Sequence, residues 1–428
     1  LMLWAKVVGL YPGAAIAWVP VAIGLALVAW RYRKWRPQHV LGVAEAWARS
    51  DALWPDLTLI FVLILIFAVR LLVVRTMETG LWADSYQHTV MTQLMLDRGG
   101  LFDSWEPYSP YQSLTVHFGF PAAAAVLAWA KGQGSTEAVL LTGQLMNGFA
   151  ALALYPLAVR IAKGNRWAGV GAVLAAGILS PMPAFYVNWG RFAQLTGQTI
   201  LPVALWLMWE TVEKRSSPWR VASLAGLAAS GMALAYYRMP FYFATFIVVW
   251  LISWGLPRWR TDARSWLRGL SRLLLVGGVA LLLLLPLVFR LAGGQLAADL
   301  GRGITRIPPV NVLLQNYEVW QNIEFYVPIL MLATAIVAWV FSIVRRSWAA
   351  VAVGLWVLAL AALPAGRLIR LPGASYMQSF AILIALYIPI SLLVGWLVGE
   401  VAVVLGRAGK HYALALVLIA ITLWGTWE

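Results

Sequence analysis

The sequence predicts an all-α, polytopic membrane protein with about 12 transmembrane helices and two interfacial helices in its first long outer loop. Of its 428 residues, 62% are hydrophobic and only 11% are charged, whereas soluble globular chains are nearer half apolar and a quarter charged. Long apolar runs recur from one end of the chain to the other. A strand-rich outer-membrane barrel would instead show short segments of alternating hydrophobicity.

Twelve apolar runs each approach the ~20 residues that a helix needs to cross a bilayer. They are roughly 7–30, 56–74, 136–160, 167–187, 195–213, 220–237, 240–256, 270–291, 324–344, 348–365, 375–399 and 409–427. A thirteenth candidate, 113–130, contains His117 and Pro121 and is rich in Ala rather than Leu. We expect this segment to lie in the interface without crossing.

Basic residues set the direction of the spans. If 113–130 does not cross, six connecting segments fall on one side and together hold 20 of the 32 Lys and Arg. These segments are 31–49, 160–166, 214–220, 258–272, 345–346 and 407–410. The positive-inside rule makes this side cytoplasmic, so the first long loop lies outside. The net charge of +15 is then explained by cytoplasmic loops, and no nucleic-acid partner is expected.

The whole chain, 1–428, reads as a single transmembrane domain with 76–135 as an extracytoplasmic loop. A second outer loop covers 292–322. Cysteine is absent, which excludes disulfides and thiolate metal sites within the chain. Because the chain stops at Glu428 directly after an apolar run, further residues beyond 428 are expected.

The first outer loop gathers acids and histidines in a chain that is otherwise poor in charge: Asp84, His88, Asp97, Asp103, Glu106 and His117. The stretch 84–98 has helical spacing, which places Asp84 and His88 on one face, and Gly99-Gly100 would end the helix. Its apolar residues Val90, Leu94 and Met95 are expected to lie against lipid. The segment 113–130 forms the second surface helix.

This order resembles the GT-C superfamily of polyprenyl-lipid-dependent glycosyltransferases, such as the protein O-mannosyltransferases, the aminoarabinose transferases and the catalytic subunits of oligosaccharyltransferase. There, an acid opens the first long outer loop, two interfacial helices follow, and the next span ends in basic residues. Here these features match Asp84, the helices 84–98 and 113–130, and the trio Arg160, Lys163 and Arg166. The resemblance covers roughly 55–215. Many members carry two adjacent acids, whereas Ser85 follows Asp84 here, so metal dependence stays open.

The resemblance implies transfer of a sugar from a polyprenyl-phosphate donor to an acceptor hydroxyl. The hydroxyl is a weak nucleophile, and Asp84 can take its proton as general base. A single displacement would invert the anomeric centre. The alternative reading of Asp84 is a helix N-cap, which is compatible with a base.

Charge developing on the leaving phosphate needs a cation, either arginine or metal. The outer face supplies Arg191, Arg238, Arg302, Arg306, Arg367 and Arg370 as substrate-binding candidates. The last two pairs are spaced i, i+4 and i, i+3, so that one helical turn presents both guanidinium groups. Structural alternatives are interface anchoring, snorkelling or simple solvation. Arg70, inside the second span, is expected to snorkel or to pair structurally.

Asp103 and Glu106 are candidates for a second acidic, substrate-binding site, or else belong to a solvated turn. His88 and His117 can supply metal or substrate ligands, with Asp84 as a third ligand for a divalent metal. The structural alternative for both histidines is a hydrogen-bonded role at the membrane interface.

The sequence therefore predicts a multi-pass enzyme of the cell envelope, a glycosyltransferase with its active site on the extracytoplasmic side of the cell membrane. The expected partners are the lipid bilayer, a polyprenyl-phosphate-linked sugar, and an acceptor that is a lipid, a glycan or a protein. Two alternatives stay open. One is a polar-lipid transporter or flippase, and the other is a catalytically inactive subunit that packs against partner membrane proteins.

Overall fold

The computed structural model describes residues 1–33, 37–110, 117–213, 218–255, 259, 261–292, 309–371, 374–407 and 409–427. Every regular element in these residues is a helix, and no strand occurs among them. The predicted all-α class is confirmed.

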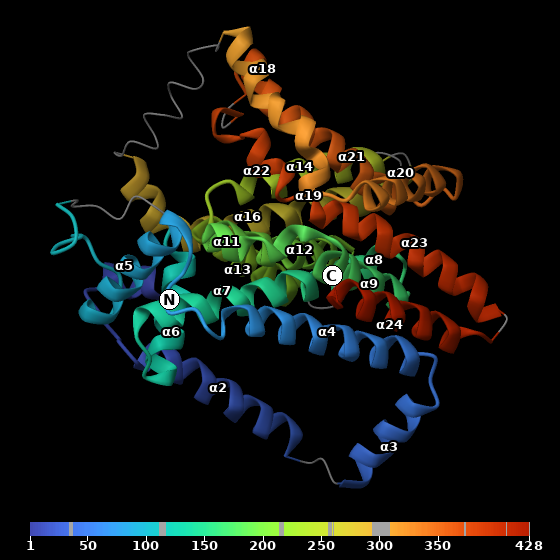
Figure 1. Ribbon diagram of the computed structural model, residues 1–428, viewed down its shortest axis with the longest axis horizontal. Helices are drawn as coiled ribbons and strands as arrows, with labels where there is room; N and C mark the ends of the chain where they lie inside the picture. The colour runs from blue at the N-terminus through green and yellow to red at the C-terminus, as the bar shows by residue number, and fades with distance from the viewer. Residues whose placement is uncertain are drawn as a thin grey trace.

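Most of the helices run along one long bundle (Figure 1). The first half of the chain forms α1 Met2–Val7, α2 Ala15–Tyr32, α3 Pro37–Ala48, α4 Leu53–Val74, α5 Trp82–Arg98, α6 Gly119–Lys131, α7 Ser135–Leu152, α8 Leu154–Ile161, α9 Arg166–Leu174, η1 Ala175–Leu179, α10 Pro181–Ala184, α11 Tyr186–Trp189 and α12 Phe192–Glu213. The second half forms α13 Pro218–Ala235, α14 Met239–Trp250, η2 Leu251–Gly255, α16 Ala263–Ala292, α18 Val310–Glu318, η3 Val319–Asn322, α19 Ile323–Tyr326, α20 Ile329–Val344, α21 Trp348–Ala362, η4 Leu363–Ile369, η5 Ala374–Tyr376, α22 Ser379–Leu383, α23 Tyr387–Arg407 and α24 His411–Trp427.

Within the described part of the chain, six helical stretches are long and apolar enough to cross a bilayer: Ala15–Tyr32, Leu53–Val74, Ser135–Ile161, Ala263–Leu291, Trp348–Ile369 and Ser379–Arg407. A seventh results if the bent pair Val310–Tyr326 and Ile329–Val344 counts as one span. Four apolar helices of 10–17 residues are shorter than the usual span. These stretches indicate a helical membrane protein, whereas the count of about 12 spans stays a prediction.

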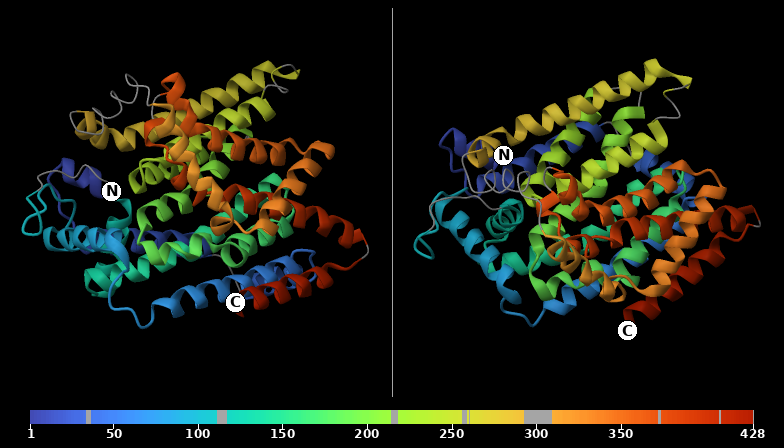
Figure 2. Two further views of the ribbon diagram at one scale, coloured as in Figure 1. Left: turned by 45° about the horizontal axis from the view of Figure 1, so that its top comes forward. Right: turned by 90° about the horizontal axis from the view of Figure 1, so that it is seen from above.

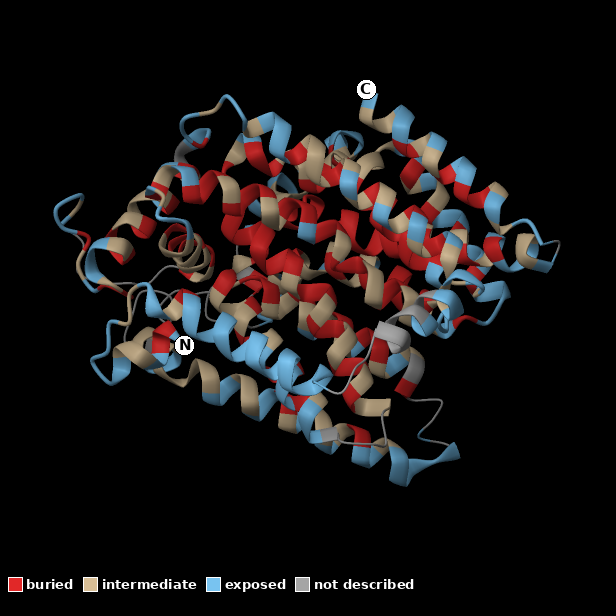
Figure 3. Cartoon of the chain, turned by 90° about the horizontal axis from the view of Figure 1, so that it is seen from below, coloured by how far each residue is buried: buried red, intermediate tan, exposed pale blue. Residues whose placement is uncertain are grey.

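The centre of the bundle is protein-packed, and its perimeter is apolar and exposed (Figure 3). In the stretch Ser379–Arg407, 89% of the most apolar window is buried, against 6% for α2 and for Ala263–Leu291. Soluble monomers rarely expose continuous apolar surface of this extent. The perimeter helices are therefore the ones that lipid would cover, and α23 forms part of the core.

Both helices predicted in the first long loop are present, as α5 and α6, although residues 111–116 lie outside the described part. Gly99 ends α5 in the left-handed conformation with φ 68°, as the Gly99-Gly100 pair predicts. Both helices lie at one end of the bundle, close to the end of α4 (Figure 1). Their position relative to a membrane surface stays a prediction.

The apolar face of α5 packs against protein. Leu94 and Met95 are 1% and 0% exposed and belong to a buried cluster with Leu3 of α1 and Phe102. The expectation that Leu94 and Met95, with Val90, lie against lipid is therefore wrong for the first two, while Val90 packs on the same cluster and is partly buried. The helical pattern identified the apolar face correctly, but α1 and the segment after α5 fold over it.

Candidate functional site

Asp84 lies in the first turn of α5, three residues after the N-cap position, which Leu81 occupies. No side chain caps this helix, so Asp84 does not act as an N-cap. Its carboxylate still interacts favourably with the positive end of the helix dipole. Ser85, the next residue, is buried and donates a hydrogen bond from Oγ to the Leu81 carbonyl at 2.7 Å. Asp84 therefore lies in a first turn of α5 that the Ser85–Leu81 hydrogen bond holds in place.

The partner of Asp84 is Arg191, whose Nε lies 3.7 Å from Oδ2 of the carboxylate. The side chains are 47% and 35% exposed, so solvent screens the pair and it contributes only ~0–1 kcal/mol. Partial burial raises the pKa of Asp84, and the positive charge of Arg191 partly offsets this rise. A carboxylate with a raised pKa is a stronger base than a free aspartate once it is ionised.

Gly190 brings Arg191 to this position, and sequence reasoning missed it. Its φ is 64°, in the left-handed region. A Cβ at Gly190 would lie 2.0 Å from Ser85 Oγ and 2.7 Å from the Ser85 nitrogen. Only glycine allows this approach of the 186–191 segment to α5. The sequence signal that could have revealed it is a glycine directly before the arginine in "NWGR".

Arg191 lies against one ring of an aromatic cluster. Its guanidinium lies 4.9 Å from the ring centroid of Phe380, the second residue of α22. The Phe380 ring in turn lies 5.6 Å from that of Trp189 and 5.9 Å from that of Tyr326. Such rings stabilise a cation through its contact with the π face. They also offer the flat apolar faces on which sugar rings commonly pack. The contact with Phe380 was not predicted, because α22 is almost 200 residues away in the chain.

Arg238 is buried, at 8% exposure, and lies in the turn between α13 and α14. It donates hydrogen bonds to the Tyr376 carbonyl at 2.7 Å, the Tyr236 hydroxyl at 2.6 Å and Gln378 Oε1 at 3.5 Å. The sequence places Arg238 among the arginines expected to bind the phosphate of a substrate. In the structure its hydrogen bonds go to neutral oxygens of its own chain, and its part in binding a substrate stays a prediction.

Tyr236 helps to hold Arg238. Its hydroxyl accepts a hydrogen bond from Arg238 Nη1, and its ring centroid lies 5.5 Å from the guanidinium carbon. Of the predicted arginines, Arg191 therefore pairs with Asp84, whereas Arg238 is held by neighbouring groups of its own chain.

His88 and His117 are both enclosed by aromatic rings. The ring of His88 lies 5.0 Å from that of Phe120, and the ring of His117 lies 4.9 Å from that of Tyr236. Burial, together with the charge of His117, lowers the pKa of His88 to about 3. Burial and the charge of Arg238 lower the pKa of His117 to about 4. Both imidazoles are neutral at pH 7.

The described residues contain no group of three His, Cys, Asp or Glu side chains that could hold a metal ion. The predicted set of Asp84, His88 and His117 is therefore not assembled as a metal site. His88 Nδ1 is buried without a hydrogen-bond partner, and the aromatic packing accounts for the position of the ring.

Asp103 belongs to a different part of the loop. It accepts a hydrogen bond from Lys6 Nζ at 2.7 Å and pairs with Arg290 of α16. Burial would raise the pKa of Asp103, but the hydrogen bond and charge of Lys6 and the guanidinium of Arg290 hold it below its usual value. Asp103 follows the end of α5 whereas Asp84 begins it, and the helix between them is roughly 20 Å long. Asp103 therefore ties α1 and α16 together.

Glu106 is exposed, and its backbone N–H donates to Ser104 Oγ at 3.2 Å. Arg367 is partly exposed in η4 and Arg370 is exposed just after it, with neither forming an ion pair with a described residue. Their backbones are joined by the bond from the Arg370 N–H to the Arg367 carbonyl at 3.2 Å. The two remaining predicted arginines, Arg302 and Arg306, lie outside the described residues.

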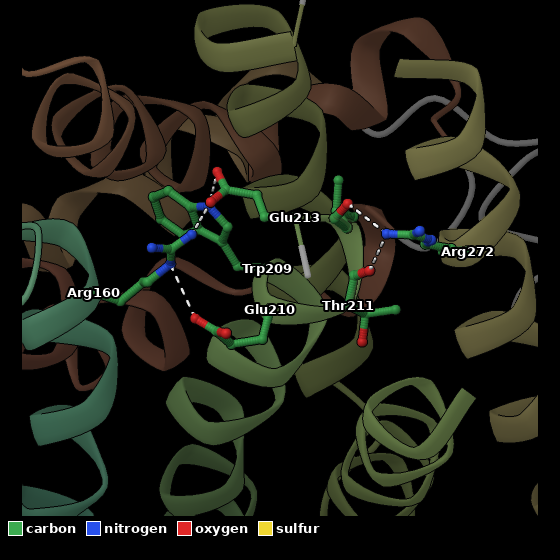
Figure 4. A network of polar contacts seen from close by, with 7 residues as sticks. Arg160, Trp209, Glu210, Thr211, Glu213 and Arg272 are labelled. Atoms are coloured by element: carbon green, nitrogen blue, oxygen red, sulfur yellow. Dashed lines mark hydrogen bonds and ion pairs between the residues drawn. The ribbon is translucent and has the colours of Figure 1, made fainter. Parts of the chain in front are cut away.

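A separate polar network ties α8 to α12 (Figure 4). Arg160 pairs with Glu210 at 3.2 Å and with Glu213, and its guanidinium lies 5.4 Å from the Trp209 ring centroid. In the same network, Arg272 donates to the Thr211 carbonyl at 3.3 Å and so binds the last turn of α12. These residues stand in or beside the segments predicted to be cytoplasmic. They fasten helix ends and are not part of the Asp84 cluster.

Comparison with known proteins gives no family for this chain. No family model matches it, and no curated protein sequence matches it at a significant level. The resemblance drawn from the first outer loop is therefore a hypothesis that rests on the residues themselves.

Proposed function

We propose that the chain is a membrane glycosyltransferase that moves a sugar from a polyprenyl-phosphate donor to an acceptor at the extracytoplasmic face. The observation that carries the proposal is the pairing of Asp84 with Arg191 at the start of α5, next to the aromatic rings around Phe380. An acid that can take a proton and a cation that can face a departing phosphate are the groups that sugar transfer from a phosphate uses, and the flat apolar rings offer a surface for the sugar.

In the proposed reaction, the acceptor hydroxyl oxygen forms a bond to the anomeric carbon as the bond from that carbon to the phosphate oxygen breaks. The proton of the hydroxyl passes to the Asp84 carboxylate, and the electron pair of the broken bond leaves on the phosphate. Attack from the face opposite the phosphate inverts the anomeric centre. Asp84 suits this role because it is half-exposed, and an acceptor can reach it from water.

Arg191 supplies positive charge for the departing phosphate. Its ion pair with Asp84 is long and screened, so turning the guanidinium from the carboxylate to a phosphate costs only ~0–1 kcal/mol. The same movement frees Asp84 to accept a proton. Arg238, held by Tyr236 and the Tyr376 carbonyl, contributes its charge from a fixed position.

The proposed setting is a multi-pass protein with about twelve spans and with the Asp84 end outside. Two features support it. Asp84 and Arg191, both predicted on the outer side, form an ion pair with each other. Arg160 and Glu210, predicted at the cytoplasmic side, likewise pair with each other.

A catalytically inactive membrane subunit is the second candidate. It is favoured by Asp103, whose charge is compensated by Lys6 and Arg290, and by Arg238, whose guanidinium donates hydrogen bonds to groups of its own chain. Arg70, a buried charged residue of an apolar helix, would suit a transporter or flippase of polar lipids.

The test is to offer polyprenyl-phosphate sugars, with a broad set of acceptors, to the purified protein and to measure the release of polyprenyl phosphate. The proposal expects turnover with at least one donor and a product of inverted configuration. Absence of turnover with every donor would favour the inactive subunit. Movement of lipid-linked sugar across a vesicle membrane without bond cleavage would favour the flippase.

A further inference from the structure

Arg70 is a buried cation without a carboxylate partner among the described residues. Arg70 belongs to the last part of α4, one turn before the helix ends, and the residue is 8% exposed. Nε donates to Asn147 Oδ1 at 2.9 Å, and Nη2 donates to the Gly177 carbonyl at 2.7 Å. Both acceptors are neutral. They fix the guanidinium in place and leave its charge uncompensated.

Such an arrangement is costly in a membrane. A charge taken out of water requires an opposite charge and good hydrogen bonds, and charged groups within spans are rare for this reason. The hydrogen bonds of the described residues use Nε and Nη2 and leave Nη1 of Arg70 without an acceptor. An anion at that position would supply both the missing charge and the missing acceptor.

Arg70 lines a cavity of about 1110 Å³ between α4, α20, α24 and the η1 region. The helices α4 and α24 run side by side along this part of the molecule (Figure 2). Leu330 and Trp424, at the cavity, are 80% and 60% exposed, so the cavity opens onto the apolar perimeter that lipid would cover.

Two further polar residues that line the cavity have side-chain atoms without hydrogen-bond partners. Ser180 and Gln144, which also line it, are 3% and 0% exposed, and neither Ser180 Oγ nor either amide atom of Gln144 has a hydrogen-bond partner. Buried polar atoms are rarely left without partners in folded proteins. Here they lie beside an open space that also holds an uncompensated cation.

The local backbone is adapted to this site. Gly177 belongs to η1, a π-helical turn, and turns of this type recur at functional sites. A Cβ at Gly177 would lie 2.2 Å from Ile66 Cδ1. The glycine therefore lets η1 approach α4 closely enough for its carbonyl to receive Arg70.

We propose that this cavity binds a lipid whose phosphodiester pairs with Arg70 and whose acyl or prenyl chain lies along the apolar walls. A phosphodiester carries one negative charge, which one guanidinium neutralises, whereas a phosphate monoester carries about −1.5 to −2 at pH 7. Arginine's fork also matches the geometry of phosphate oxygens. Apolar chains suit walls formed by residues such as Leu174, Val394 and Leu418.

Two lipids share this chemistry: a membrane phospholipid and a polyprenyl-phosphate sugar. The cavity reaches the segment that carries Arg191, because Asn188 lines it three residues earlier. A polyprenyl-phosphate sugar bound here would hold its one phosphate at Arg70 before transfer and pass it to Arg191 for the reaction, and that reading rests on the proposed function. A bound phospholipid would not depend on it.

The test titrates the purified, delipidated chain in detergent with dioleoylphosphatidylglycerol, a polyprenyl-phosphate hexose, and dioleoylglycerol, which lacks the phosphate. Bound lipid is read by native mass spectrometry. Arg70→Gln should weaken binding of the phosphodiester lipid about tenfold or more. The matched control is Arg75→Gln, an exposed arginine at the end of the same helix, which should leave binding unchanged.

Thr334→Trp, which narrows the cavity from α20 and keeps Arg70, should weaken binding as well, and it decides the question if Arg70→Gln fails to fold. If Arg70→Gln weakens the binding of phosphatidylglycerol but not of the polyprenyl-phosphate hexose, the cavity is a phospholipid site. If it weakens the binding of the polyprenyl-phosphate hexose, the cavity is a site for the sugar donor. Unchanged binding in both variants, or equally tight binding of dioleoylglycerol, would overturn the proposal. Asp84→Asn should bind like the wild type, so a lost transfer activity is distinguishable from a lost lipid site.

Discussion

Replacing Gly190 by alanine tests how Arg191 is held against Asp84. A non-glycine residue at φ 64° costs ~1–2 kcal/mol. The new Cβ would also lie 2.7 Å from the backbone nitrogen of Ser85, which cannot rotate away, so that α5 and the 186–191 segment must separate. Overpacking of this kind costs ~1–3 kcal/mol. The expected loss of stability is therefore roughly 2–5 kcal/mol, together with a lower rate of sugar transfer.

Gly132→Ala is the matched control. Gly132 also ends a helix, at φ 67°, but a Cβ there would meet nothing within 4 Å. It should lose only the ~1–2 kcal/mol of the backbone conformation. The two variants are compared by thermal unfolding in the same detergent and by transfer rate. Equal destabilisation by both substitutions would refute the reasoning that the 186–191 segment packs tightly on α5.

Three further predictions concern charge and topology. Because the positive charge of Arg191 lowers the pKa of Asp84, Arg191→Met should move the acid limb of the pH–rate profile to higher pH, and an unmoved limb would argue against Asp84 as the titrating base. The pKa of Asp103 is lowered on folding, so its contribution to stability is fully present above the unfolded value of about 3.9 and is lost as the pH falls through the lowered pKa of the folded state. At neutral pH, Asp103→Asn should cost ~1 kcal/mol or less, because the carboxylate is 55% exposed, and in thermal unfolding the difference from wild type should shrink as the pH falls through that lowered pKa. In the otherwise cysteine-free chain, a cysteine in place of Tyr108 should react with an impermeant thiol reagent in intact cells, and one in place of Asp262 should not; the reverse pattern would invert the topology.

The sequence predicts local features of the first loop well. The helix at 84–98 and its end at Gly99-Gly100 depend on spacing and on the φ that glycine permits, and both are read within a few residues. What covers the helix depends on distant segments. Leu94 and Met95 have the apolar spacing of a lipid-facing stripe, yet α1 covers them.

For the candidate site too, the sequence identifies individual residues but not the contacts between them. Asp84 stands out because it is an acid shortly after an apolar run, and Arg191 because it lies among aromatic residues in an outer segment. Their contact depends on Gly190 and the packing of α5, and the ring of Phe380 arrives from α22. Hydropathy locates apolar runs but does not show whether a short helix crosses the bilayer, so the number of spans stays a prediction.

The most direct test of the central claim is the transfer rate of Asp84→Asn relative to wild type, with Asp97→Asn as control. Asp97 is an exposed acid on the same helix, held by Gln93 Nε2 at 2.7 Å. Asparagine at 84 keeps the size of the side chain and removes its basicity, at a cost in stability of ~1 kcal/mol or less. Loss of a general base predicts a fall of about 100- to 10,000-fold in rate for Asp84→Asn, with little change for Asp97→Asn. Full turnover by a folded Asp84→Asn variant would contradict the role of Asp84 as the base.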